Sequence, residues 1–494
     1  MGKVSRRAIL AAGAAAGAAA VGGAFFLKVS RRRPKNLVLI MADALRQDRL
    51  GMKGPGGRSL TPFLDSAGLT GTVFTNCIAA SSWTLPSVAA FFTSRVPVVA
   101  GQYYSEGFAS DAITVTQALR SAGYDTLAVV KNPWLPARTA TGELLPTVIT
   151  RGFDYYDVRG FVMEPNPLFA QGIGQEKEFV SFPPAEEAVD KAVSVLKARK
   201  GGDKRPFFLY LHLMNTHEPY SPSSAHRGLA DAAPPVEGIP DHLLFKVIRH
   251  RGKTRGAEML SGEDAPIMAR AKALYDAATA STDAAVARLA EYLEGVGAAE
   301  DTIFVFTADH GEEFGEHRWF GHAVTLYQEV LRVPLVMWGA GVASGLRVDT
   351  ASSAIDVAPE MLRVARLPEL GSAEGEALAA GAGLAAREAV SCTVFPALPQ
   401  KLESVTVSLI DCEGRKVIRK RRADAPDKAE LEVFDLNADP GETTNVAAGS
   451  AEAAASITKR MDQYAANAAR RPSVPALTLD DEARKQLKSV GYLN

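Results

Sequence analysis

Long runs of consecutive apolar residues, each ending in polar ones, recur along the chain. They occur in NLVLIMAD (36–43), DTLAVVKN (125–132), RPFFLYLHLMNTH (205–217) and DTIFVFTADHG (301–311). An unbroken apolar run of this length predicts a strand that is buried on both faces. The polar residues that follow each run are therefore expected at the carboxyl end of a buried strand.

Helical periodicity separates these runs, most clearly in residues 188–199 and 271–297. Strands that alternate with helices predict an α/β domain whose mostly parallel sheet is sandwiched by helices. Ligands of such sheets bind beyond the carboxyl ends of the strands. We therefore expect four side chains that are distant in sequence to converge: Asp43, His217, Asp309 and His310.

Two further segments differ from this core in composition and in the length of their apolar runs. Residues 218–265 are rich in proline, glycine and charge, which predicts an irregular insertion that covers the site. From about residue 385 the apolar runs become short and typical of β-strands, and a Glu-Gly turn signal at 413–414 separates two of them. The sequence thus predicts a catalytic domain over 34–384 and a smaller antiparallel subdomain with amphipathic helices over 385–494.

The first 33 residues have the pattern of an export signal. Paired Arg6 and Arg7 precede an Ala/Gly-rich apolar run over 8–27, which is typical of a twin-arginine signal. An uncleaved membrane anchor is the alternative, because the run approaches the ~20 residues that span a bilayer. Both alternatives predict an exported protein, either periplasmic or anchored outside the cytoplasm with membrane association through its N-terminus.

Composition excludes several classes of protein. The 494 residues carry a formal net charge of −1, which argues against a nucleic-acid partner. Three scattered cysteines are too few for a disulfide framework or a thiolate metal site.

Histidine, by contrast, is concentrated where chemistry is expected. Three of the eight histidines fall in ADHGEEFGEHRWFGH (308–322) and two in LHLMNTH (211–217). Two carboxylates and an imidazole, from Asp43, Asp309 and His310, would form a site for a divalent metal if a threonine hydroxyl completed it. Mixed oxygen and nitrogen ligands favour Zn²⁺ or Mn²⁺ over Ca²⁺ or Mg²⁺. Taken alone, Asp43 would be better explained as a helix cap or a turn residue than as a metal ligand.

The segment SSWTLPSVAAFFTS (81–94) supplies such a threonine. Thr84 followed by Pro86 is typical of a helix start, where a hydroxyl caps the first turn. A helix start also attracts anions, and there a hydroxyl activated by a metal becomes a nucleophile. The local sequence leaves both interpretations open.

Several motifs in order resemble the sulfatase family of the alkaline phosphatase superfamily, over nearly all of the chain after residue 35. The matching segments are residues 36–51, 81–94, 122–132, 211–220, 275–317, 321–339, 431–447 and 479–493. The resemblance implies an alkaline-phosphatase-like fold. It also implies a metal site formed by Asp43, Thr84, Asp309 and His310, with Thr84 as nucleophile.

The same resemblance implies roles around the metal. His217 and His322 would hold or protonate the transferred group. Lys131 and Asn132 occupy the segment of a further anion-binding residue, and Arg46 lies in an Asp-x-x-Arg pattern that suits either substrate binding or a structural ion pair. His212 is expected to pack inside its strand, and His317 and Glu313 suit a surface pair as well as support for the site.

The chain departs from typical sulfatases at the nucleophile. Relatives carry cysteine or serine in a C/S-x-P-S-R box that matures to formylglycine, whereas this box reads Thr84-Leu85-Pro86-Ser87-Val88. The methyl group on threonine Cβ prevents oxidation to the aldehyde, so no formylglycine is expected. Ala44 also replaces a second aspartate of the calcium-type site. These features are more similar to the phosphoester branch, namely phosphoethanolamine and phosphoglycerol transferases and phosphodiesterases.

The sequence thus predicts a metal-dependent, sulfatase-like hydrolase or transferase. Its substrate would be a phosphate or sulfate ester of a small molecule, a glycan or a lipid headgroup, cleaved through a covalent intermediate on Thr84. The alternative is a catalytically silent sulfatase-fold protein that binds an anionic glycan or lipid headgroup.

Overall fold

The computed structural model describes thirteen parts of the chain. They are residues 35–97, 112–132, 135, 147–158, 162–165, 167, 178–182, 184–199, 205–255, 262–378, 387–394, 404–422 and 425–470. The predicted signal (1–33) and the last matching segment (479–493) lie outside the described residues. Within the described parts, no helix has both the length and the apolar character needed to cross a membrane.

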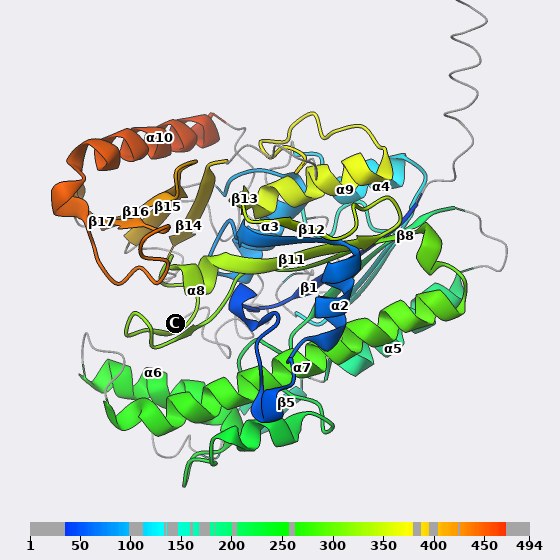
Figure 1. Ribbon diagram of the computed structural model, residues 1–494, viewed down its shortest axis with the longest axis horizontal. Helices are drawn as coiled ribbons and strands as arrows, with labels where there is room; N and C mark the ends of the chain where they lie inside the picture. The colour runs from blue at the N-terminus through cyan, green and yellow to red at the C-terminus, as the bar shows by residue number, and fades with distance from the viewer. Residues whose placement is uncertain are drawn as a thin grey trace, which may run out of the picture.

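A large mixed sheet forms the centre of the molecule (Figure 1). Its strands run in the order β12-β2-β11-β8-β1-β7-β3-β4, and β13 pairs with β2. Their bounds are β1 Asn36–Ala42, β2 Thr72–Ile78, β3 Asp125–Val130, β4 Tyr155–Val158, β7 Phe207–Leu213, β8 Thr302–Ala308, β11 Arg332–Gly339, β12 Leu346–Val348 and β13 Ser352–Ser353. Strands β8, β1, β7, β3 and β4 are parallel, and β11 runs antiparallel to both of its neighbours. The mostly parallel sheet predicted from the apolar runs is confirmed.

The order of the strands explains where the site forms. β1 lies between β7 and β8, with Ala42 in register with Leu213 on one side and Ala308 on the other. All three strands therefore end at the same edge of the sheet. The residues that follow them, including Asp43 and Asp309, meet there.

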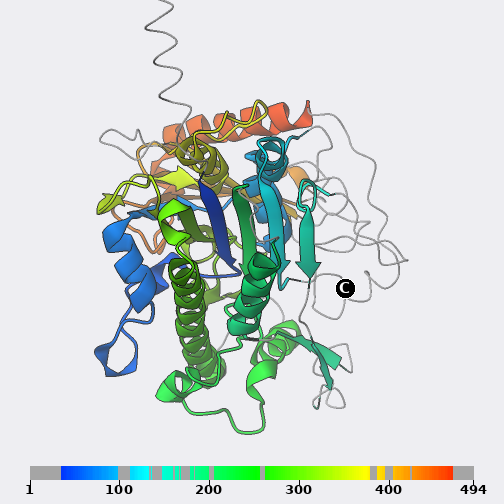
Figure 2. The same ribbon diagram turned by 90° about the vertical axis from the view of Figure 1, so that its right-hand side faces the viewer.

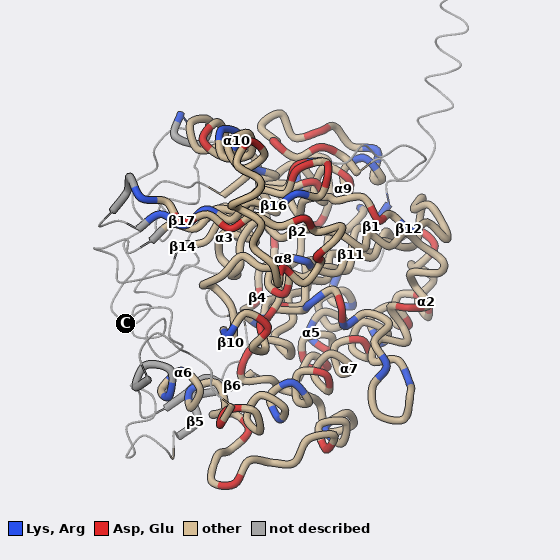
Figure 3. Tube along the Cα trace, turned by 60° about the vertical axis from the view of Figure 1, so that its left-hand side comes forward, with Lys and Arg blue, Asp and Glu red and all other residues tan. Residues whose placement is uncertain are grey.

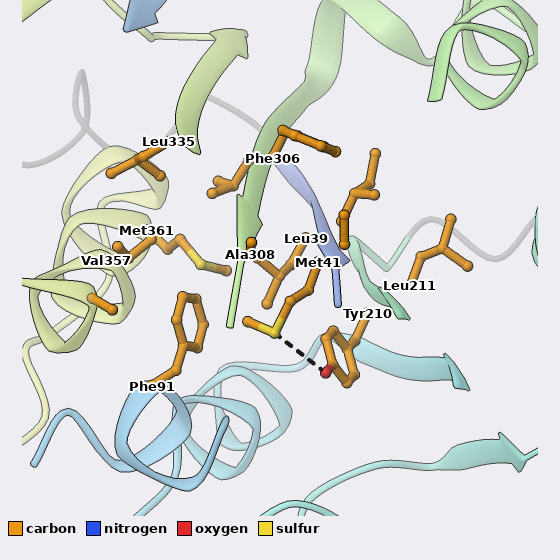
Figure 4. Packing of buried hydrophobic residues seen from close by; sticks show 14 of the residues in the cluster. Leu39, Met41, Phe91, Tyr210, Leu211, Phe306, Ala308, Leu335, Val357 and Met361 are labelled. Atoms are coloured by element: carbon orange, nitrogen blue, oxygen red, sulfur yellow. Dashed lines mark hydrogen bonds between the residues drawn. The ribbon is translucent and has the colours of Figure 1, made fainter. Parts of the chain in front are cut away.

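Two layers of helices bury the sheet. Helices α2 (Pro62–Thr70), α5 (Ala185–Ala198) and α7 (Ala265–Gly295) cover one face, and α3 (Thr84–Thr93), α4 (Val115–Ser121) and α9 (Val357–Ala365) cover the other (Figures 1 and 2). Between the second layer and the sheet, Phe91 and Met361 pack near Leu39 and Phe306 (Figure 4). The unbroken apolar runs are thus explained by burial on both faces.

A four-stranded antiparallel sheet lies beside the large one, as predicted. It comprises β14 (Ala389–Val394), β15 (Ser404–Ile410), β16 (Arg415–Arg422) and β17 (Ala425–Asp435), and α10 (Ala451–Ala469) packs on it (Figure 1). Trp83 and Ala80, which precede α3, belong to the same apolar cluster as Val390 and Val407 of this sheet. The small sheet therefore packs directly against the loop that leads to Thr84.

The insertion over 218–265 is more regular than the composition predicted. It contains α6 (Leu244–Arg255) and short 3-10 turns at Arg227–Ala232 and Asp241–Leu243. Val247 and Ile248 of α6 pack with Ile267 of α7 in a small core of their own. Apolar residues spaced for one helix face outweigh the local glycine and charge, which is why the expectation of an irregular tract was wrong here.

Two short antiparallel pairs and one short helix complete the strands and α-helices of the described residues. β5 (Val162–Pro165) pairs with β6 (Glu178–Ser181), β9 (Glu313–Phe314) pairs with β10 (Phe320–Gly321), and α8 (Gln328–Leu331) precedes β11. The β9–β10 hairpin carries the chain from His310 toward His322.

Candidate active site

Asp43, the first residue after β1, is fully buried and lies at the centre of the site. Its Oδ2 accepts hydrogen bonds from His212 Nε2 at 3.0 Å, Asn132 Nδ2 at 2.8 Å and Thr84 Oγ1 at 3.3 Å. Burial acts to raise the pKa of this carboxyl, but the charge of His217 and the hydrogen bond from His212 outweigh it and hold the pKa far below its usual value. Asp43 is therefore a carboxylate at neutral pH.

Asp309 and His310 leave the end of β8 together. Asp309 Oδ1 accepts the backbone N–H groups of Ala44 at 3.1 Å and of His310 at 2.9 Å. Ala44 adopts the left-handed conformation (φ 59°), and this directs its N–H toward the carboxylate. His310 Nδ1 contacts the carbonyl of Gly311 at 2.9 Å, so the ring presents Nε2 to the site.

Gly311 is required by a close approach of two backbones. A Cβ atom here would lie 2.0 Å from the carbonyl oxygen of Glu329, and the N–H of Gly311 donates to the carbonyl of Val330. Its φ is not in the left-handed region. The glycine thus lets the chain after His310 pass against the residues before β11.

Thr84 is the first residue of α3, and its hydroxyl turns into the site. Trp83 is the N-cap residue, and no side chain caps this helix. Thr84 Oγ1 instead lies 3.3 Å from Asp43 Oδ2 and 3.4 Å from His310 Nε2. The interpretation of Thr84 as a helix cap is therefore wrong, although the helix itself begins where Pro86 predicts it.

The loop before Thr84 is held in place by Ser87. Its Oγ accepts the N–H of Ser81 at 3.0 Å and donates to the carbonyl of Ser81 at 2.9 Å. These two bonds close the loop on the first turn of the helix. The position of the Thr84 hydroxyl is thus set by local structure as well as by the sheet.

The donor set fits a divalent metal ion. One ligand atom from each of Asp43, Asp309 and His310 lies within 4.8 Å of the other two. Asp43 Oδ1 and Asp309 Oδ2 are buried and have no hydrogen-bond partner among the described residues. Two buried carboxylate oxygens that face an imidazole nitrogen without donors of their own are what a bound cation would satisfy.

His322 and His217 lie beside this centre. The ring of His322 is centred 4.5 Å from that of His310 and 4.8 Å from that of His217. Burial acts to lower the pKa of His217, but Asp43 and Glu218 raise it, and the net shift is upward. Burial and the charge of His310 hold the pKa of His322 well below its usual value. The structure thus brings together both histidines and the four residues expected at the metal.

The three predicted anion-binding residues occupy different places. Asn132 donates to Asp43, and Lys131 is buried with its Nζ 3.8 Å from Glu187. The Arg46 guanidinium is bound by Asp48, Glu316 and the carbonyl of Glu312. These contacts favour the ion-pair alternative for Arg46, and contact of Lys131 and Asn132 with a substrate stays a prediction.

Two residues of the site were not assigned to it from the sequence. His212 lies within β7, where strand alternation favours packing, yet it binds Asp43 and its Nδ1 contacts the Tyr210 hydroxyl at 2.7 Å. Glu312 follows the Asp-His-Gly motif, and its carboxylate contacts His322. The one local signal in the sequence was proximity to a predicted site residue. Glu312 lies two residues after His310, and His212 lies five residues before His217.

His317 and Glu313 are not paired with each other. Glu313 accepts from the Thr325 hydroxyl at 2.6 Å. His317 stacks on Tyr327, and its Nε2 lies 3.4 Å from Glu329 Oε2, in a group of metal-ligating side chains that includes Glu442. The ammonium of Lys416 lies 2.6 Å from Glu442 and supplies positive charge there, so this second group is explained as an ion-pair network.

Comparison with known proteins shows the family of the chain. A family model described as Sulfatase matches residues 35–367. The chain is 25% identical over 350 residues to the ulvan-active sulfatase of Formosa agariphila, and the match covers 69% of this chain and 64% of that protein. It is 26% identical over 388 residues to the multifunctional alkaline phosphatase superfamily protein PehA of Trinickia caryophylli, covering 66% and 73%.

A solved structure has the same fold. The phosphonate monoester hydrolase of Agrobacterium radiobacter matches with a TM-score of 0.62 and 18% sequence identity, covering 88% of this chain and 96% of that one. The expected α/β sheet sandwiched by helices, with a smaller antiparallel sheet, is confirmed as an alkaline-phosphatase-like fold.

Proposed function

Because the chain belongs to the sulfatase family, we propose that it is a metal-dependent ester hydrolase that cleaves a phosphate or sulfate ester through a covalent intermediate on Thr84. The observation that carries the proposal is the position of the Thr84 hydroxyl, which lies within 3.4 Å of both Asp43 and His310. A threonine turned away from its helix-capping role into a buried carboxylate–imidazole cluster is poorly explained by structure alone.

We propose that Asp43, Thr84, Asp309 and His310 bind the metal, and that Zn²⁺ or Mn²⁺ suits this set better than Ca²⁺ or Mg²⁺. A bound divalent cation would polarise an ester oxygen and lower the pKa of the nucleophile. The proposed ligands come from the ends of β1 and β8 and from the start of α3. No formylglycine takes part in this proposal, since threonine cannot form the aldehyde.

The remaining steps belong to residues of the chain. Thr84 attacks as an alkoxide, and a bond forms from Oγ1 to phosphorus or sulfur while the bond to the leaving oxygen breaks. The free N–H groups at the start of α3 favour the anionic group that is transferred. His322 and His217, whose rings lie beside the cluster, would donate protons to the leaving oxygen and to the transferred group. Water or an acceptor alcohol then releases the group from Thr84.

The substrate class follows from the nucleophile and from the relatives. A threonine alkoxide in place of formylglycine favours a phosphate or phosphonate ester. Proteins similar to this chain are named as a sulfatase, a phosphonate monoester hydrolase and a multifunctional alkaline phosphatase superfamily protein. We propose a small-molecule, glycan or lipid-headgroup ester, and no nucleic acid, in keeping with the net charge of −1. We also propose export directed by residues 1–33, which cell fractionation of an Arg6→Lys/Arg7→Lys variant would test.

A substrate panel tests the function. Chromogenic phosphate monoesters, phosphate diesters, phosphonates and sulfates are offered to wild type loaded with Zn²⁺, Mn²⁺ or Ca²⁺. We expect turnover of at least one ester by wild type, retained in part by Thr84→Ser and lost in Thr84→Val. Asp309→Asn and His310→Ala are expected to lose bound metal while the fold is kept.

The alternative, a silent binding protein, makes a different prediction. If wild type and Thr84→Val are equally inert and hold no metal, the enzyme is excluded and the binding protein is favoured. Unchanged metal content in Asp309→Asn would instead contradict the ligand assignment alone.

A further inference from the structure

Glu312 is a fully buried carboxyl group beside the site that the proposed reaction does not yet use. Its backbone is fixed on both sides: the N–H donates to the carbonyl of Glu329 at 3.0 Å, and the carbonyl accepts from Arg46 Nη1 at 3.0 Å. The side chain therefore leaves a rigid backbone three residues after Asp309.

Both oxygens of this carboxyl group are engaged. Oε1 lies 2.8 Å from His322 Nδ1, and Oε2 accepts the hydroxyl of Tyr220 at 3.2 Å. The Tyr220 ring packs edge-on against Tyr275 of α7, which fixes the hydroxyl in turn. A carboxyl group held through both oxygens has one orientation, and it offers that orientation to the imidazole.

The backbone around His322 is restrained as well. Gly321 has a φ of 99°, and a Cβ atom on it would lie 2.5 Å from the Phe245 ring of α6. Ala323, on the other side, donates its N–H to the carbonyl of Ser82 at 2.8 Å. Figure 3 shows β10 next to α6, so the insertion supports the segment that carries His322.

These restraints decide which nitrogen of His322 faces the reaction. Nδ1 contacts Glu312, so Nε2 points from the opposite side of the ring. The ring itself lies between His310 and His217, with centroid distances of 4.5 and 4.8 Å. Without Glu312, the imidazole could rotate and present either nitrogen.

We propose that Glu312 is a positioning residue that orients His322 as the proton donor to the leaving group. This inference rests on the proposed ester hydrolysis. As the bond from phosphorus or sulfur to the leaving oxygen breaks, its electron pair stays on that oxygen, and the proton on His322 Nε2 moves to it. The second proton is shared between Nδ1 and Oε1 throughout, so the Glu312–His322 pair is neutral before the transfer and carries one negative charge after it, and no isolated imidazolium is required. A buried carboxylate that orients a catalytic histidine in this way is a recurring arrangement.

Leaving-group dependence distinguishes this role from a structural one. A 4-nitrophenyl ester releases a stable anion and needs little protonation, whereas an alkyl ester of the same acid needs a proton. General acid catalysis contributes about 10²- to 10⁴-fold. For Glu312→Gln we expect kcat on the alkyl ester to fall by about 10²-fold or more, while kcat on the 4-nitrophenyl ester and the metal content change little.

The chain provides matched controls. Glu313→Gln changes the neighbouring buried carboxyl group, which contacts Thr325 instead, and should leave the ratio of the two rates unchanged. Tyr220→Phe removes only the Oε2 contact, and we expect a smaller loss with the same leaving-group dependence, so it carries the test if Glu312→Gln folds poorly. The double variant Glu312→Gln/His322→Ala should be no slower than His322→Ala.

Side-chain ¹⁵N NMR of histidine separates this inference from the proposed function, because it needs no turnover. In wild type we expect a protonated, hydrogen-bonded Nδ1 for His322, and loss of that signature in Glu312→Leu. An unchanged signature would overturn the positioning role even if the enzyme is active. Equal losses on both esters, or additive losses in the double variant, would overturn it as well.

Discussion

At the scale of single residues, one oxygen atom organises the site. Asp43 Oδ2 accepts from His212, Asn132 and Thr84, and these donors come from β7, from the residues after β3 and from α3. The opposite oxygen, Oδ1, has no hydrogen-bond partner in the described parts of the chain. Donors on one oxygen thus orient the other toward the proposed metal, as partners of metal ligands usually do.

The contact from His212 leads to a measurable prediction. His212→Ala should weaken metal binding by about 10- to 100-fold, because Asp43 loses a buried donor that fixes its orientation. Competition with a chromogenic chelator measures the affinity. His317→Ala, a histidine change outside this cluster, serves as the control, and an equal loss in both variants would contradict the role of His212.

The proposed metal ligands could be identified from the sequence, whereas the residues that hydrogen-bond to the site residues could not. Asp43, Asp309 and His310 stand at strand ends, where a polar residue after a buried run marks a site edge. His212 stands inside such a run, and only pairing of β7 with β1 shows that its ring reaches Asp43. Glu312 was missed for a similar reason, since its partner His322 returns to it through the β9–β10 hairpin.

At the scale of elements, β14 holds two parts of the site together. Ser391 Oγ donates to the carbonyl of Ala79, before the loop that leads to Thr84, and Thr393 Oγ1 donates to the carbonyl of Ala323, beside His322. The N–H of Cys392 binds the carbonyl of Ala80. The small sheet thus supports both segments, a role that its alternating residues could not reveal.

A buried ion pair joins this sheet to the start of α8. Lys416 of β16 and Glu442, which also accepts the N–H of Gln328 at the start of α8, are both fully enclosed. We predict that Lys416→Met lowers the free energy of unfolding by about 3–5 kcal/mol, because it leaves a buried carboxylate without a counter-charge. Urea denaturation measures the loss.

The double variant Lys416→Met/Glu442→Gln is the control for this pair. Glutamine removes the stranded charge and keeps an oxygen for Gln328, so most of the lost stability should return. A double variant as unstable as Lys416→Met would show that packing of the lysine, and not its charge, matters.

At the scale of the whole molecule, the fold brings distant segments to one sheet edge. The order β8-β1-β7-β3 places residues 309–310, 43, 212 and 132 next to one another. The class of fold was readable from the alternation of apolar runs and helical patterns. The strand order was not, because β11 enters antiparallel between β8 and β2, and only long-range pairing fixes that arrangement.

Binding of a metal that bridges β1, β8 and α3 should stabilise the whole domain. At a free metal concentration of about 100 times Kd, linkage predicts a gain of about 2.7 kcal/mol in the free energy of unfolding. Denaturant titration of the metal-free protein with and without added Zn²⁺ measures it. Asp309→Asn should show no gain at the same concentration, and an equal gain would place the binding site elsewhere.

If the Thr84 hydroxyl is the nucleophile, the enzyme carries a covalent group on Thr84 during turnover, and this group can be trapped. The metal-loaded enzyme is mixed with an excess of the fastest ester of the panel, quenched with acid within one turnover, and digested for peptide mass spectrometry. We expect one phosphoryl or sulfuryl group on the peptide that contains Thr84, with fragmentation assigning it to that residue, and none in Thr84→Val. Turnover by the wild type without any such adduct, or an active Thr84→Val variant, would contradict the role of Thr84 as nucleophile.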